Sequence, residues 1–158
     1  MKEKMSHNKF GIILFSVAIA NCAMTPARAF GNDEHWVSGW GMGTKEAIIT
    51  KGPGNQIYVA CEEGSTNPSS ISFMLGGDGP RGDQITLTFD ETDPQDFWIT
   101  NGEITSDCHA CAANFDTVIE LLKSHNSVHV RFENGLSTRF SLSGSGEAIG
   151  QCVAGFYR

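Results

Sequence analysis

Two cysteines separated by two residues are the sharpest candidates for chemistry in the sequence. The motif Cys108-His109-Ala110-Cys111 precedes a stretch with helical periodicity. The positive end of a helix stabilises a thiolate, and a histidine between two thiols can tune their reduction potential. The spacing therefore predicts either a thiol–disulfide exchange pair, Cys108 and Cys111, or a small structural disulfide that fixes the start of the helix.

The position of the motif favours the structural disulfide. Thioredoxin-like oxidants carry this spacing early, in a βαβ unit, and a cis-proline loop follows it, whereas here no proline follows Pro94. A zinc site would need His109, both cysteines and a fourth ligand such as Cys61 or His125. Structural zinc sites usually pair two ligand couples, and the sequence offers one. We therefore predict no metal and no other cofactor.

A dense acidic segment, residues 90–96, is the second candidate site. Its carboxylates could contact a basic partner, hold calcium or act as an acid–base pair on sugars. The calcium-loop spacing that ends in a glutamate is absent, and a solvated loop is the simplest interpretation. A tryptophan follows closely and could add an aromatic contact. The candidate binding residues are Asp90, Glu91, Asp93, Asp96 and Trp98.

The N-terminal 29 residues have the pattern of a signal peptide. A lysine-rich start precedes the apolar stretch 10–20, and Ala27-Arg28-Ala29 fits the small-x-small cleavage rule. An uncleaved anchor, or a lipoprotein modified at Cys22, are the alternatives. Cleavage after Ala29 leaves one acidic domain, residues 30–158, with a net charge near −10. We expect a bacterial periplasmic or secreted protein without a stable membrane anchor, and the charge argues against nucleic acid as a partner.

The cysteine count predicts a disulfide framework. The domain retains four cysteines, which form two disulfides in an oxidising compartment and allow three connectivities. We favour Cys61–Cys152 with Cys108–Cys111, because Cys61 ends an apolar strand and Cys152 lies near the C-terminus. The first bridge would then tie the C-terminal segment to the sheet.

Short runs with period-two alternation, separated by turn residues, predict a mainly β (α+β) fold. We expect a small disulfide-stapled antiparallel β-sandwich with one short helix, residues 115–122, capped by Asn114 or Asp116. Asn134-Gly135 predicts a type I′ hairpin turn between the last two strands. The predicted strands are Trp36–Trp40, Glu46–Thr50, Gln56–Cys61, Ser70–Leu75, Gln84–Phe89, Phe97–Thr100, Val128–Phe132 and Ser137–Leu142.

The order of features over roughly the last 100 residues resembles a known family. The features are Ile57-Tyr58-Val59-Ala60-Cys61, Thr88-Phe89-Asp90, Phe97-Trp98, the helix from Phe115 to Leu122, Val128–Phe132, Phe140–Gly144, Ala148-Ile149 and Cys152. They resemble the small exported β-sandwich domain of the VasI type, found among type VI secretion accessory proteins and periplasmic proteins. The resemblance implies a Cys61–Cys152 bridge and a noncatalytic role. The Cys108–Cys111 pair and the Gly-rich loop 76–82 depart from it.

Three functions follow from these observations. The leading expectation is a noncatalytic periplasmic or secreted binding or accessory protein, whose partner is another envelope or secretion protein. The first alternative is a thiol–disulfide oxidoreductase acting through Cys108 and Cys111. The second is an acidic inhibitor of a basic wall-degrading enzyme, with the acidic segment as its contact surface.

Overall fold

The computed structural model describes residues 30–62 and 67–154, so the predicted signal peptide lies outside the described residues. Nine strands and two helices occur in the described part of the chain. They are β1 (Val37–Gly41), β2 (Thr44–Thr50), β3 (Gln56–Glu62), β4 (Ser70–Met74), β5 (Gln84–Phe89), β6 (Gln95–Trp98), β7 (Glu103–Thr105), α1 (His109–Ser124), β8 (Ser127–Phe132), β9 (Ser137–Ser141) and α2 (Ser145–Ile149).

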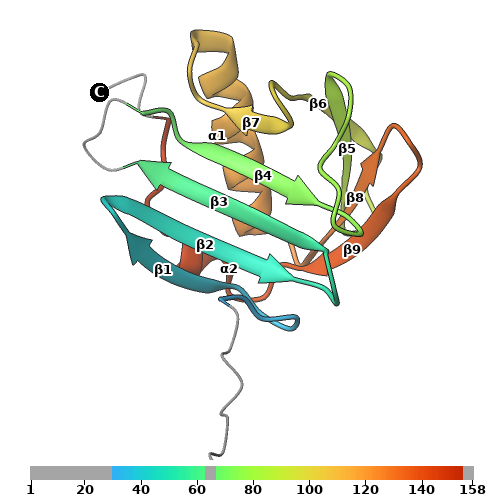
Figure 1. The fold of residues 1–158 in the computed structure, drawn as a ribbon, viewed down its shortest axis with the longest axis horizontal. Helices are drawn as coiled ribbons and strands as arrows, with labels where there is room; N and C mark the ends of the chain where they lie inside the picture. The colour runs from blue at the N-terminus through green and yellow to red at the C-terminus, as the bar shows by residue number, and fades with distance from the viewer. Residues whose placement is uncertain (1–29, 63–66, 155–158) are drawn as a thin grey trace, which may run out of the picture.

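The strands form two antiparallel sheets. The first has five strands in the order β1-β2-β3-β4-β7, and the second has four in the order β6-β5-β8-β9. In Figure 1, α1 lies behind the five-stranded sheet, and the four-stranded sheet stands beside them. Side chains from both sheets and from α1 meet in one hydrophobic core. The predicted fold class, mainly β with a sandwich-like arrangement, is confirmed.

The alternation along the strands explains this arrangement. In β5, Ile85, Leu87 and Phe89 are buried, while the residues between them are half-buried, because successive side chains in a strand point to opposite faces. All eight predicted strands are present, with ends within two residues of the prediction. The structure adds β7, which pairs with β4 in the register Ile71↔Ile104 and was not predicted.

The predicted turn at Asn134-Gly135 is wrong in type. Gly135 has a positive φ of 88°, but Asn134 does not, and a type I′ turn requires both. The Gly135 N–H donates to the Phe132 carbonyl at 3.0 Å, and the Phe132 N–H donates to the Leu136 carbonyl at 2.9 Å. The loop therefore holds three residues and ends with a left-handed glycine, a geometry that keeps the strands paired.

The type I′ pattern occurs instead at Asn101-Gly102, where φ is 53° and 84°. The flanking residues Thr100 and Glu103 exchange two backbone hydrogen bonds, of 2.8 and 3.1 Å. This tight turn leads from β6 into β7. It therefore transfers the chain from the four-stranded sheet to the edge of the five-stranded sheet.

Helix α1 is longer than the predicted stripe and begins at a different cap. It spans 16 residues and buries Ala112, Phe115, Val118, Ile119 and Leu122, which confirms the apolar face. The N-cap is Cys108, neither Asn114 nor Asp116, since the helix starts within the cysteine motif. A second helix, α2, was not predicted. Among the described residues, no helix is long and apolar enough to span a membrane.

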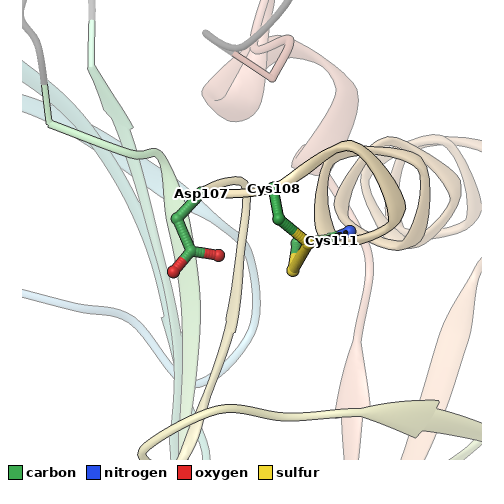
Figure 2. A group of neighbouring side chains, drawn as sticks. All are labelled: Asp107, Cys108 and Cys111. Atoms are coloured by element: carbon green, nitrogen blue, oxygen red, sulfur yellow. Dashed lines mark hydrogen bonds between the residues drawn. A yellow bond between two sulfur atoms is a disulfide. The ribbon is translucent and has the colours of Figure 1, made fainter.

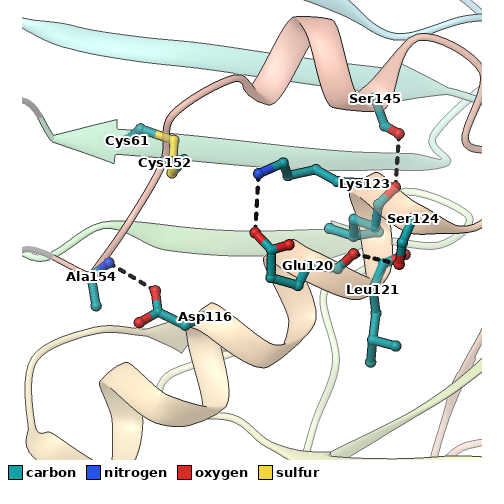
Figure 3. A network of polar contacts seen from close by, with 10 residues as sticks. Cys61, Asp116, Glu120, Leu121, Lys123, Ser124, Ser145, Cys152 and Ala154 are labelled. Carbon is teal, nitrogen blue, oxygen red and sulfur yellow. Dashed lines mark hydrogen bonds and ion pairs between the residues drawn. A yellow bond between two sulfur atoms is a disulfide. The ribbon is translucent and has the colours of Figure 1, made fainter.

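The C-terminal segment closes the domain. The Trp36 N–H donates to the Ser143 carbonyl at 2.9 Å, and its indole Nε1–H donates to the Ser141 carbonyl at 3.1 Å. A disulfide joins Cys61 in β3 to Cys152 after α2, and both cysteines are buried. Figure 3 shows this disulfide beside α1. Further hydrogen bonds tie the segment to α1, from Ser145 Oγ to the Leu122 carbonyl and from the Ala154 N–H to Asp116 Oδ1.

Candidate functional site

The second disulfide, Cys108–Cys111, lies at the start of α1. Its two Cα atoms are 4.9 Å apart, and the Cys111 N–H donates to Cys108 Sγ at 3.1 Å. Cys108 has extended backbone dihedrals and takes the N-cap position, where a side-chain acceptor satisfies a helix N–H that has no intrahelical partner. Cys108 is exposed and Cys111 is half-buried. Cys108 is therefore accessible to solvent.

The carboxylate of Asp107 lies beside this disulfide (Figure 2). One of its oxygens and the two sulfur atoms lie within 4.8 Å of one another. The sulfur atoms are bonded to each other, so they do not act as thiolate ligands in this state. The zinc ligands considered from the sequence do not come together. Cys61 is bonded to Cys152. His125 is the C-cap of α1, so the length of this 16-residue helix, about 24 Å, separates it from the cysteine pair.

A pocket of about 420 Å³ adjoins the disulfide. It lies between the ends of β6 and β7 and the first turns of α1. Its lining includes Asp83, Trp98, Ile99, Thr105, Cys111 and Asn114. Trp98 is 65% exposed, which is unusual for so large an apolar side chain. The pocket therefore places an accessible indole next to an accessible disulfide.

Three hydrogen-bonded elements hold the backbone at this wall of the pocket. Trp98 is paired with Gln84 of β5 at the end of the β5–β6 ladder. The side chain of Asn114 in α1 donates from Nδ2 to the Trp98 carbonyl at 3.0 Å. The Ile99 N–H donates to the Asp83 carbonyl at 2.9 Å. Trp98 is consequently fixed at its backbone while its side chain stays accessible.

The predicted acidic contact residues lie at different places along the β5–β6 hairpin. Asp90, Glu91 and Asp93 lie in the loop between β5 and β6, at the opposite end of that hairpin from Trp98. Asp96 points outward from β6 and accepts a hydrogen bond from Thr86 Oγ1 at 2.7 Å. The three loop carboxylates are thus separated from Trp98 along the hairpin, whereas Asp96 shares a face of β6 with it. Of the five residues, only Trp98 lines the 420 Å³ pocket.

Asp90 has a structural role in this loop. Its carboxylate accepts hydrogen bonds from the backbone N–H groups of Ser127, at 2.8 Å, and Asn126, at 3.1 Å. Desolvation alone would raise the pKa of Asp90, but these hydrogen bonds outweigh it and hold the pKa below its ordinary value of 3.8. Asp90 therefore fixes the connection between α1 and β8.

Replacing Asp90 by asparagine should lower the thermal unfolding midpoint at pH 7. Because the folded-state pKa is depressed, the stabilisation is present above pH 3.8 and is lost as the pH falls through the folded value. The difference in thermal unfolding midpoint between wild type and Asp90→Asn should therefore become smaller as the pH falls. Thermal unfolding by circular dichroism from pH 7 to pH 2 checks this, with Asp93→Asn in the same loop as the matched control. Equal midpoints for both variants at pH 7 would contradict the assignment.

Sequence reasoning missed two of the residues that surround Trp98. Asp83 reaches the pocket through the β5–β6 register, which pairs Gln84 with Trp98 and brings the preceding residue beside Ile99. Asn114 follows Cys111 by three residues, so the two share one face of α1. The helical spacing could have identified Asn114, since Cys111 was already a candidate.

Comparisons with known proteins give one family match. The family model YfjT matches residues 34–149. This range includes every described strand and both helices, and it contains the Cys108–Cys111 pair and Trp98. No curated protein and no solved structure matches the chain.

Proposed function

The chain belongs to the YfjT family, and we propose that it is a noncatalytic binding or accessory protein acting on another protein of the bacterial envelope or secretion apparatus. The observation that carries the proposal is the 420 Å³ pocket with Trp98 65% exposed at its wall. Tryptophan is among the residues that contribute most to protein–protein affinity when a partner covers them. The resemblance to VasI-type accessory domains favours the same class of function.

The proposed location is the periplasm or the exterior of a bacterium. The signal-peptide pattern of residues 1–29 supports export. Two disulfides, Cys61–Cys152 and Cys108–Cys111, fit an oxidising compartment, since such bonds persist there and are rare in the cytosol. The acidic inhibitor considered from the sequence is a special case of the proposal, in which the partner is a basic wall-degrading enzyme.

Capture of partners from an envelope extract tests the binding function. The full chain, expressed with its own N-terminal segment and purified in oxidised form, is compared with Trp98→Ala and Trp40→Ala. Trp40 is 62% exposed but does not line the pocket, so it is a matched control. We expect a partner that wild type and Trp40→Ala bind alike and that Trp98→Ala binds about tenfold more weakly.

Two results would count against the proposal. If no partner binds saturably at micromolar concentration, in low and in moderate salt, the binding function is wrong. If the captured partner binds Trp98→Ala as well as wild type, the pocket is not its site. Circular dichroism of each variant establishes that the compared proteins are folded.

A second candidate function is thiol–disulfide exchange. It is favoured by the exposed position of Cys108 at the N-cap of α1 and by the Cys111 N–H that donates to its sulfur. In this reaction a dithiol substrate would lose two electrons and two protons, and the Cys108–Cys111 disulfide would be reduced by them. The first substrate thiolate would attack the exposed Cys108 sulfur and release the Cys111 thiolate. The second substrate thiolate would then displace Cys108, whose thiolate the helix end would stabilise.

The reduction potential of the Cys108–Cys111 pair separates the two functions. Mass mapping of alkylated peptides across a dithiothreitol or glutathione series measures it. The binding function predicts a value below about −300 mV, as in structural disulfides. A value above about −230 mV, with insulin reduction that Cys108→Ser abolishes, would instead establish exchange chemistry.

A further inference from the structure

The pocket beside Trp98 combines an accessible aromatic ring with a carboxylate. We infer that it receives the protonated side chain of a lysine or arginine on the protein partner, an inference that rests on the proposed binding function. The two residues that would recognise the cation are Trp98 and Asp83, which line the same pocket. A cation is attracted to the face of an indole, and a carboxylate neutralises its charge.

The charge distribution favours a cation over an anion. Asp83 lines the pocket, and no lysine, arginine or histidine of the described residues does. Arg81, two residues before Asp83, forms its ion pair with Asp78 at 3.8 Å. Asp107 adds a second carboxylate beside the Cys108–Cys111 disulfide at the edge of the pocket.

The positive end of α1 would oppose a cation, but it is partly neutralised. The Cys111 N–H, which has no intrahelical partner, already donates to Cys108 Sγ at 3.1 Å. Asp107 immediately precedes the cap, where a negative charge offsets the helix dipole. Among the described residues that line the pocket, Asp83 therefore carries the only formal charge.

The pocket is large enough to admit a long side chain. A volume of about 420 Å³ lies near the lower end of the range for small-molecule pockets, about 300–1,000 Å³. Buried Ile99 lines the pocket and can contact the methylene stem of a lysine or arginine, while the charged group meets Trp98 and Asp83. Asn114 and Gln84 hold the backbone that carries Trp98 in place.

Titration with short peptides, followed by NMR, tests the inference on the purified oxidised chain. The probes are acetyl-Gly-Lys-Gly-amide and its arginine analogue, with norleucine and glutamate analogues as controls. The chain contains three tryptophans, whose indole N–H signals report separately. We expect the Trp98 signal to shift with the lysine and arginine peptides, the Trp36 and Trp40 signals to stay unchanged, and the affinity to fall with added salt.

Two variants make the expectation quantitative. Asp83→Asn should weaken binding of the lysine peptide at least about fivefold. Asp93→Asn, which removes an exposed carboxylate outside the pocket, should leave the affinity unchanged. In Trp98→Ala, the side-chain amide signal of Asn114 reports on the pocket, and it should no longer respond to the lysine peptide.

The outcomes separate this inference from the proposed function. Equal shifts with the norleucine or glutamate peptide would overturn the cation site, as would an unchanged affinity in Asp83→Asn. If a protein partner depends on Trp98 but the cationic peptides do not bind, the inference fails and the binding function stands. If the cationic peptides bind but no protein partner is captured, the chemistry of the pocket is supported and the protein partner is overturned.

Discussion

Replacing Cys61 and Cys152 together by alanine is expected to lower the free energy of unfolding by about 3–5 kcal/mol. The bond joins residues 91 positions apart, so it restricts the unfolded chain far more than a local bridge does. Both cysteines are buried, and the smaller alanines also leave unfilled space in the core. A loss of this size is a large part of the stability of a typical domain, about 5–15 kcal/mol.

Denaturant unfolding, followed by the fluorescence of buried Trp36, measures the effect. The matched control is the double variant Cys108→Ala with Cys111→Ala, whose bridge spans three positions and predicts about 2 kcal/mol at most. The free energy of unfolding should therefore be highest for wild type, lower for the variant without the Cys108–Cys111 bridge, and lowest for the variant without the Cys61–Cys152 bridge. Equal losses for the two double variants would show that closure of the long loop does not dominate.

Replacing Phe115 by alanine is expected to cost about 3–5 kcal/mol. Phe115 is fully buried in α1, and its ring belongs to the core shared by the helix and both sheets. Because α1 carries Cys108 at its start and Asn114 against Trp98, its anchoring also sets the geometry of the pocket. Amide hydrogen exchange should accordingly speed up in α1 and at the end of β6.

The control for this change lies on the opposite face of the same helix. Thr117 is exposed and its hydroxyl donates to the Ala113 carbonyl at 2.7 Å, so Thr117→Ala removes no core contact. Alanine also has the better helix propensity, and the free energy of unfolding should stay within about 0.5 kcal/mol of wild type. A loss below about 1.5 kcal/mol in Phe115→Ala would mean that the core closes around the smaller side chain.

Most of the fold could be predicted from the sequence, because a strand that faces the core on one side alternates apolar and polar residues. β5 shows this directly in Ile85, Leu87 and Phe89. β7 could not be found in this way, since three residues are too few for an alternation. It exists because a tight turn at Asn101-Gly102 brings it against β4. The turn is local, but the pairing of β7 with β4 joins residues far apart in the sequence.

The candidate site was predicted only in part, for the same reason. Trp98 and the cysteine pair were recognised by residue type and local spacing, which the sequence displays. Asp90 was taken for a binding residue, yet its carboxylate accepts hydrogen bonds from N–H groups 36 and 37 positions further along the chain. Asp83 joins the pocket through the register of a hairpin. Such long-range contacts are fixed by packing and have no local sequence signal.

The hydrogen bonds of Trp36 and the partner of Cys61 restrict the order in which the growing chain can fold. β1, β2, β3 and β4 are successive antiparallel neighbours and can pair as the chain lengthens. Trp36 nevertheless lacks its hydrogen-bond acceptors until Ser141 and Ser143 have emerged, and Cys61 lacks its disulfide partner until Cys152 has emerged. During that interval Cys108 and Cys111 are already available to Cys61. Mispaired disulfides are therefore a hazard of the nascent chain, and a disulfide isomerase should raise the yield of correctly folded protein.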